Sequence, residues 1–305
     1  GMAGGVLFPS LADPLAPAPK WGMYLFLFMC FIAVDLKETW RGIRAAPGII
    51  FYLTAVKLLL LPVLLWGFFR LVFPEYALAG LLLGAAPIGV VVPVFAIILG
   101  VDFTLVLIGI AVTTLLLPIT LPPLTHAAAS FGGTAVLDLP LGDMTLSLAV
   151  TIFVPLLCAQ LSRWKAPTVT AWFSRRRSSI STVLVFLTGL AIFSRYSGIL
   201  RQDVSILVES LVMALSIAAL SFIVTALLTR GFATPRRVAF VMSCTGLNNV
   251  LCLILSSEFF TVREALVSAF YQIPFFGFVI VYKLFLQYLN KKDAAASGRA
   301  GTSAE

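Results

Sequence analysis

Hydrophobic residues along the chain come in long, nearly uninterrupted runs, without the three-to-four-residue spacing of an amphipathic helix. A bilayer core of about 30 Å needs roughly 20 apolar residues per helix, because unpaired backbone groups in hydrocarbon cost several kcal/mol each. The runs therefore predict an all-α membrane protein. We interpret nine spanning helices, at about 22–35, 49–69, 77–100, 103–124, 143–161, 180–198, 204–228, 238–257 and 265–289.

Composition agrees with this pattern. Of the 305 residues, 60% are hydrophobic and 11% are charged, and the mean hydropathy is +1.06, as expected of a chain dissolved in lipid. The strands of an outer-membrane barrel would alternate apolar and polar residues, and these runs do not. We expect one membrane domain over 1–292 and a disordered cytoplasmic tail over 293–305, which reads "DAAASGRAGTSAE". A cleaved signal peptide is not expected, since no basic residue precedes Lys20.

Basic residues between the runs predict the topology, because Lys and Arg are retained on the cytoplasmic side during insertion. One set of alternate loops, with the tail, holds Lys37, Arg41, Arg44, Arg163, Lys165, Arg175, Arg176, Arg177, Arg230, Arg236, Arg237, Lys291, Lys292 and Arg299. The opposite set holds Lys20, Arg70, Arg195, Arg201 and Arg263. We therefore expect a multi-pass protein of the cell inner membrane, with its N-terminus outside and its C-terminus cytoplasmic. The net charge of +8 is then a topology signal, not a mark of nucleic-acid binding.

Catalytic and metal chemistry finds little support in the sequence. The four cysteines lie inside predicted helices without C-x-x-C spacing, and the single histidine, His126, sits at a helix end. We find no paired carboxylates, no nucleophile with a base and no metal cluster. An enzyme is therefore disfavoured, and no cofactor is expected, although a proton or sodium could serve as a coupling ion.

Two of the runs carry helix-breaking residues at mid-span. In the third, Pro87, Gly89 and Pro93 remove helical hydrogen bonds and loosen the backbone. In the eighth, "TGLNN" places Thr245, Gly246, Asn248 and Asn249 at the corresponding depth. Interrupted helices at matching places in two halves of a membrane chain are typical of a transporter site, where half-helix ends aim their dipoles at substrate and ion. The alternative is that prolines only kink these helices and that asparagines only hold helices together.

Four segments in this order resemble the bile acid:sodium symporter family, whose relatives include arsenite and auxin efflux carriers. They are "LFPSLADPLAP…KWGMYLFLFMCFIAVDLKETW", "AVKLLLLPVLLW", "APIGVVVPVFAIILGVD" and "CTGLNNVLCLILSSEFF". The similarity covers about 6–290. The resemblance implies two inverted five-helix repeats with two crossing broken helices, the first repeat lacking its first helix here. It also implies a core over about 49–124 and 204–289, and a panel over about 22–35, 143–161 and 180–198.

The chain departs from the family at the positions that hold sodium. Val92 and Pro93 stand where the family pattern has Ser-Asn, and Val106 and Ile110 stand where hydroxyls are expected. Cys244 takes the place of a buried glutamate. Sodium prefers a shell of oxygens, so these replacements predict weak sodium binding.

Lys57 replaces the family's sodium-binding glutamine about 8 residues into its span. A lysine at that depth costs several kcal/mol unless it meets protein, water or a partner. We hypothesise that its ammonium replaces the bound cation and lies against the broken-helix carbonyls and Asn248, with its protonation either static or part of the transport cycle. The alternative is that Lys57 snorkels or lines a water-filled vestibule.

The sequence thus favours a secondary transporter that moves a small organic anion by alternating access, sodium-independent or proton-coupled. The alternatives are a sodium-coupled symporter and a transport-incompetent sensor or scaffold. An arsenite carrier is less favoured, because no cysteine lies near the third-run break. The residues expected to bind substrate or ion are Lys57, Pro87, Gly89, Val92, Pro93, Thr245, Gly246, Asn248 and Asn249. Substrate identity, direction of transport and oligomeric state stay open.

Overall fold

The computed structural model describes residues 4, 7, 10, 12–15, 17–32, 34–132, 141–202 and 205–302. Across them the chain is helical, and the all-α prediction is confirmed. The helices are α2 (Ala12–Leu15), α3 (Ala18–Ile32), α4 (Leu36–Ala45), α5 (Pro47–Ala55), α6 (Leu61–Val72), α7 (Ala77–Ala85), α8 (Val92–Leu99), α9 (Phe103–Gly132), α10 (Leu141–Lys165), α11 (Pro167–Arg195), α12 (Ser197–Gln202), α13 (Ser205–Leu228), α14 (Thr234–Thr245), α15 (Asn249–Phe259), α16 (Val262–Phe270) and α17 (Gln272–Thr302). A π-helical turn, η2 (Val56–Leu60), joins α5 to α6, and a 3-10 turn, η3 (Pro74–Tyr76), precedes α7.

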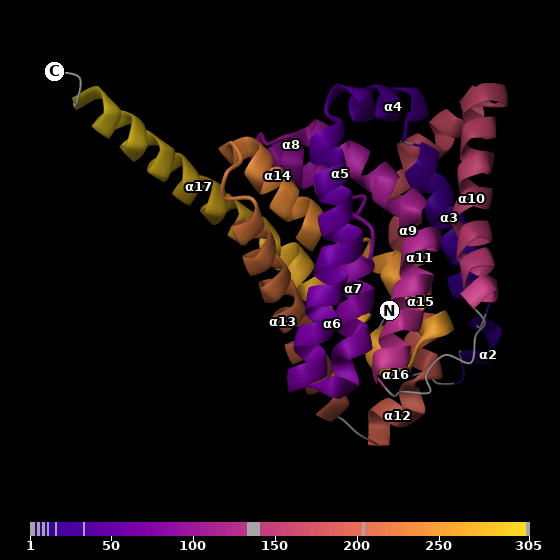
Figure 1. The fold of residues 1–305 in the computed structure, drawn as a ribbon. Coiled ribbons are helices and arrows are strands. Elements are labelled where there is room, and N and C mark those ends of the chain that lie inside the picture. The colour runs from indigo at the N-terminus through magenta and orange to yellow at the C-terminus, as the bar shows by residue number, and fades with distance from the viewer. Residues whose placement is uncertain are drawn as a thin grey trace.

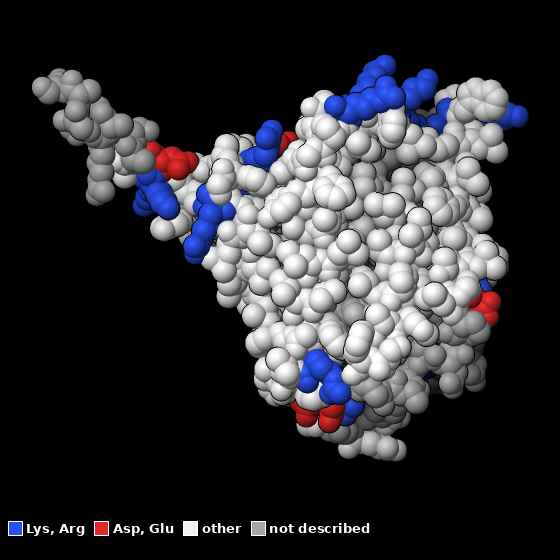
Figure 2. All heavy atoms as spheres, in the orientation of Figure 1, with Lys and Arg blue, Asp and Glu red and all other residues white. Residues whose placement is uncertain are grey.

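Within the described residues, five helices are long and apolar enough to cross a membrane, or up to seven if each of two bent pairs is one span. The five are Pro47–Val72, Phe103–Phe131, Leu141–Lys165, Ser205–Leu228 and Val262–Ala295. Figure 2 shows a broad belt without charged residues, with lysines, arginines and acids gathered toward the two ends. The molecule is therefore a multi-pass membrane protein, and the count of nine spans stays a prediction.

The helices form two groups that lie side by side in Figure 1. Helices α10 and α11 pack along α3 at one side of the molecule. The other group contains α5–α9 and α13–α17, in which α6 packs on α7 and α15 on α16. Helix α4 runs across one end of the molecule, and α17 extends away from the rest toward the C-terminus.

Two segments differ from the sequence-based expectation. Residues 162–179 were expected as a basic loop, but α11 begins at Pro167 and bends by 64° between Arg176 and Ser179. Proline is well tolerated in the first turn of a helix, and arginine is a good helix former, so the basic segment continues the helix. The bend of 64° provides the change of chain direction that was expected of a loop.

The tail over 293–305 was predicted to be disordered, but α17 continues through most of it as a helix, to Thr302. The hydroxyl of Thr234 donates to a carboxylate oxygen of Asp293 at 2.6 Å, which anchors the start of this segment to α14. The alanines at 294–296 then favour continuation of the helix. Residues 303–305 lie outside the described part of the chain.

Candidate functional site

The two interrupted runs cross each other at their breaks. Helix α7 ends at Ala85 and α8 starts at Val92, while α14 ends at Thr245 and α15 starts at Asn249. Between these half-helices, Ile88 and Leu247 form an antiparallel bridge. The N–H of Gly89 donates to the carbonyl of Gly246 at 2.8 Å, and the N–H of Asn248 donates to the carbonyl of Pro87 at 2.8 Å. Each break therefore satisfies backbone groups of the other.

Glycine is required where the two breaks touch. A Cβ atom on Gly89 would overlap the carbonyl oxygen of Leu247, and one on Gly246 would overlap the side chain of Val92. The two backbones can approach to hydrogen-bond distance only without these side chains. Pro93 lies in the first turn of α8, where its missing N–H costs nothing, so it marks the end of the break.

Two further backbone groups near the crossing find side-chain partners in neighbouring helices. The N–H of Ile88 donates to the hydroxyl of Thr113 at 3.2 Å. The hydroxyl of Tyr271 donates to the carbonyl of Thr245 at 3.0 Å. The Thr245 hydroxyl itself lies 2.6 Å from the hydroxyl of Tyr282. Unpaired backbone groups are costly in a membrane, and these contacts remove that cost.

Lys57 lies on the π-helical turn η2. The N–H of Leu61 donates to the carbonyl of Val56, five residues back, so the turn holds one residue more than an α-helical turn. Pro62 has no N–H and crowds the preceding turn, and the wider turn relieves that crowding. Such single π turns are frequent at functional sites.

The ammonium of Lys57 joins the ends of the two broken helices. Its Nζ donates to the carbonyl of Gly84 at 3.0 Å and to the carbonyl of Cys244 at 3.1 Å. These carbonyls belong to the last turns of α7 and α14, where helix dipoles concentrate negative partial charge. The side chain has 0% exposure, so Lys57 neither snorkels to the membrane surface nor faces an open vestibule in this structure.

Asn248 caps a helix and does not form the hydrogen bond with Lys57 that the hypothesis expected. Its side-chain oxygen accepts from the N–H of Leu251 at 3.3 Å and thereby caps the N-terminus of α15. The hypothesis placed Asn248 against the ammonium, but the hydrogen bonds of Lys57 go to the two carbonyls. The neighbouring Asn249 is 8% exposed, and its side-chain oxygen has no partner among the described residues.

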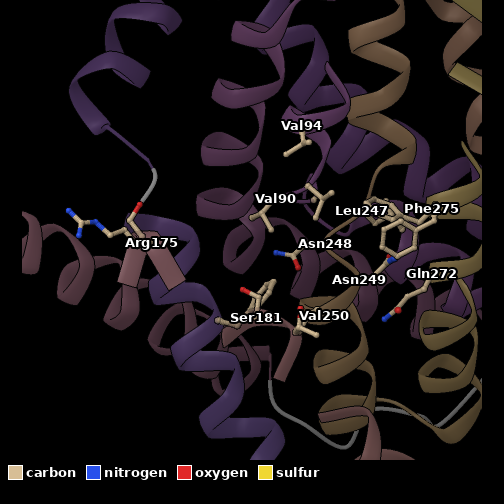
Figure 3. Close-up of a pocket in the computed structure, with 16 residues that line it drawn as sticks. Val90, Val94, Arg175, Ser181, Leu247, Asn248, Asn249, Val250, Gln272 and Phe275 are labelled. Atoms are coloured by element: carbon tan, nitrogen blue, oxygen red, sulfur yellow. The ribbon is translucent and has the colours of Figure 1, made fainter. Parts of the chain in front are cut away.

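A cavity of about 710 Å³ opens on one side of the crossing (Figure 3). Its wall combines the two breaks with α3, α11 and α17. The lining residues are Phe26, Gly89, Val90, Val91, Val94, Ser174, Arg175, Ser181, Thr182, Leu247, Asn248, Asn249, Val250, Gln272, Phe275 and Phe276. Arg175 is the charged residue of this set, and it lies at the edge, with its guanidinium turned away from the other labelled residues.

Some of the sequence-predicted site residues line this cavity, and the others lie in the crossing of the two interrupted helices. Gly89, Asn248 and Asn249 line the cavity. The others do not line it and instead build the crossing: Lys57, Pro87, Val92, Pro93, Thr245 and Gly246. Sequence reasoning missed Arg175, Gln272 and Phe275, which come from distant helices. Arg175 was assigned to a loop, and nothing in the local sequence marks the other two.

A protein-family model matches the part of the chain that contains Lys57 and the first interrupted helix. The model of the sodium bile acid symporter family matches residues 20–203, which is more than half of the chain. The chain belongs to this family. No curated protein matches the chain.

Members of the sodium bile acid symporter family are membrane transporters, and the apolar helices agree with that activity. The matched residues include Lys57 and the first interrupted helix, α7 with α8. The second interrupted helix, α14 with α15, lies beyond the matched range and is joined to the first by the hydrogen bonds at the crossing. The protein is therefore a membrane transporter of the bile acid:sodium symporter type.

Proposed function

We propose that this protein is a secondary active transporter that moves a small organic anion by alternating access, with the ammonium of Lys57 in place of a bound cation. The observation that carries the proposal is the pair of hydrogen bonds from Lys57 to the carbonyls of Gly84 and Cys244. Two converging helix C-termini would attract a mobile cation. Here a covalently attached cation occupies that position.

The surroundings of the crossing support a sodium-independent or proton-coupled cycle. Val92, Val106 and Ile110 are buried hydrophobic residues, and their side chains supply no oxygen ligand. Sodium needs several oxygen atoms around it, and the carbonyls of Gly84 and Cys244 are already engaged by the ammonium. In a sodium-independent cycle the ammonium keeps its proton, whereas in a proton-coupled cycle it releases the proton in one state.

The cavity supports an anionic substrate. Val91, the N-cap residue of α8, and Asn249, the first residue of α15, belong to its wall, and the N-terminal end of a helix favours negative charge. None of the described lining residues is acidic, and Arg175 adds a positive charge at the edge. Phenylalanine and valine side chains suit an apolar body, and the amides of Asn248 and Gln272 suit polar groups.

The same proposal includes the finer architecture and the place of the protein in the cell. If each bent pair is one span, the seven candidate spans and the two interrupted helices add up to the nine spans of the proposed pair of inverted repeats. Helices α3, α10 and α11 would form the panel, and the remaining long helices would form the core. We place the protein in the cell inner membrane, with the N-terminus outside and the basic end that carries α4 facing the cytoplasm.

Uptake into proteoliposomes tests the proposed function. The purified protein is reconstituted and offered a panel of labelled carboxylates and sulfonates under imposed sodium or proton gradients. We expect uptake of at least one anion without sodium, with or without acceleration by a proton gradient. Strictly sodium-driven uptake would contradict the role assigned to Lys57. Absence of flux for every anion would instead favour a sensor or scaffold.

A sodium-coupled symporter is the second candidate, and one observation favours it. The side-chain oxygen of Asn249 is buried without a partner, and with Thr245 and backbone carbonyls it could contribute to a sodium shell. Thermal stability of the purified protein distinguishes the two candidates. Sodium should raise the melting temperature more than equal concentrations of potassium or choline only if such a shell forms.

Substitutions at Asn248 test whether the cavity holds an anion. Asn248→Ala removes the cap of α15 and should lower the free energy of unfolding by about 1 kcal/mol. Asn248→Asp keeps a capping oxygen but adds a negative charge to the cavity. We expect Asn248→Asp to melt like the wild type and to take up the anion about 10-fold more slowly, as roughly 1.4 kcal/mol of repulsion implies. Wild-type uptake by Asn248→Asp would place the anion elsewhere.

A further inference from the structure

Helix α4 connects α3 to α5, and its ten residues are too few to span a bilayer by themselves. It follows α3 with a bend of 63° and precedes α5. In Figure 1 it runs across one end of the molecule, above the ends of α5 and α9. This orientation would place α4 along the membrane surface, with one side toward the protein and the other toward the lipid headgroups.

One face of α4 is held firmly against the protein. Thr39 is 9% exposed, and Ile43 packs against the core. A Cβ atom on Gly42 would overlap the side chain of Ile108 in α9, so the two helices are in close contact. Asp35 caps the helix by accepting from the N–H groups of Lys37 and Glu38. These contacts set which residues of α4 point outward.

The outward face carries three cations and a tryptophan in one stripe. Trp40 and Arg41 lie three and four residues after Lys37 and four and three residues before Arg44, so the four side chains share one face, and all four are exposed. Trp40 is 55% exposed, and the guanidinium of Arg44 lies 5.0 Å from the centre of its ring. Figure 2 shows the basic residues gathered at the end of the molecule where α4 lies.

The cations of this stripe have no carboxylate partner in the described part of the chain. Asp35, the nearest acid at the start of α4, is paired with Arg163 at 2.9 Å. The backbone N–H of Glu38 and the Arg163 guanidinium hold the pKa of Asp35 below its usual value, so this charge is already used. Glu38 is exposed three positions before Arg41, so it borders the stripe, but it forms no ion pair with Lys37, Arg41 or Arg44. With Glu38 counted, three cations against one carboxylate still leave this surface of α4 with a net positive charge.

We propose that the stripe of Lys37, Trp40, Arg41 and Arg44 binds the headgroup of an anionic phospholipid in the leaflet on which α4 lies. Tryptophan prefers the headgroup level, and each lysine or arginine near an anionic surface adds about 1 kcal/mol of attraction. A topology signal needs only the number of basic residues in this segment. Their placement on one face, around a tryptophan and opposite a packed face, fits a bound headgroup.

Fluorescence quenching by brominated lipid tests the proposal on the full-length chain. The protein is reconstituted into phosphatidylcholine with increasing fractions of brominated phosphatidylglycerol or brominated phosphatidylcholine. The difference between wild type and Trp40→Phe isolates the signal of Trp40. We expect half-maximal quenching of Trp40 at a fraction of the anionic lipid at least about 10-fold lower than that of the neutral one, because three cations contribute about 1 kcal/mol each. Each of Arg41→Gln and Arg44→Gln should reduce this preference roughly fivefold.

A matched variant separates a local site from general surface charge. The triple variant Lys37→Gln/Arg41→Gln/Arg44→Gln should lose the preference. The triple variant Lys283→Gln/Lys291→Gln/Lys292→Gln, which removes the same charge from α17, should keep it. Accessibility of the C-terminus to protease in the liposomes verifies that each variant is inserted in the wild-type orientation. If a triple variant is not inserted in that orientation, the single variants Arg41→Gln and Arg44→Gln measure the loss of lipid preference instead.

Three results would overturn the proposal. They are equal quenching by both brominated lipids in the wild type, an unchanged lipid preference in the α4 variants, and an equal loss of lipid preference in the α17 variant. A separate competition experiment distinguishes lipid from free phosphate. Millimolar glycerol phosphate should leave the quenching unchanged, and displacement of the lipid by it would show a site for soluble phosphate instead.

Discussion

Replacement of Lys57 by glutamine is expected to lower anion uptake by about 10-fold or more and to remove or alter its dependence on pH. The ammonium gives hydrogen bonds to the carbonyls of Gly84 and Cys244, and glutamine has a shorter side chain without charge. A lost hydrogen bond from a charged group costs about 1.5–3 kcal/mol, which corresponds to roughly 10-fold to 150-fold in an equilibrium. Lys57→Ala removes both hydrogen bonds and should cause a greater loss.

Initial uptake rates at a series of pH values, with and without sodium, measure this effect. Lys283→Gln is the matched control, because Lys283 lies on the exposed face of α17, and we expect it to behave as the wild type. Melting temperatures of all variants separate a loss of transport from a loss of fold. If the ammonium replaces a bound cation, sodium should raise the melting temperature of Lys57→Gln and not that of the wild type. Undiminished, pH-independent transport by Lys57→Gln would refute this role.

Gly89→Ala is expected to abolish uptake and to lower the free energy of unfolding by about 1–3 kcal/mol. The added methyl group would overlap the carbonyl oxygen of Leu247, and backbone cannot move aside as a side-chain tip can. Separation of the two breaks would also lengthen the hydrogen bond between Gly89 and Gly246. Uptake assays and thermal melting on the same preparation measure both effects.

Gly67→Ala is the matched control for this substitution. Gly67 lies in α6, and a Cβ atom there meets nothing within 4 Å. Alanine favours the helix over glycine by up to about 1 kcal/mol, so this variant should transport normally and melt at the same or a slightly higher temperature. Equal behaviour of the two variants would mean that the close approach at the crossing is not needed for transport.

The candidate site was predictable where it depends on local backbone chemistry. Pro87 and Gly89 in one run, and Gly246 in the other, disfavour a continuous helix, and both runs are broken there. Lys57 was recognisable because a cation inside an apolar run requires a partner. Its partners were predicted as broken-helix carbonyls and Asn248, and the particular carbonyls could not be named, because Gly84 is 27 and Cys244 is 187 residues away along the chain.

The cavity was the less predictable part. Ser181 of α11 and Gln272 and Phe275 of α17 line it together with Asn248, and these helices meet only after folding. Arg175 was assigned to a loop because a cluster of basic residues resembles a cytoplasmic connection. The structure has a bent helix instead, which brings Arg175 to the cavity edge.

The sequence by itself determined that the chain is an all-helical membrane protein, that two of its apolar runs are interrupted, and that Lys57 lies deep inside another apolar run. Each of these depends on the transfer of residues into lipid or on the backbone preferences of proline and glycine, which are local properties. Only the tertiary structure decided that the breaks cross, that Lys57 joins α7 to α14, and which helices enclose the cavity. Lipid requires that every exposed backbone group find a partner, but packing between distant helices decides which partner it finds.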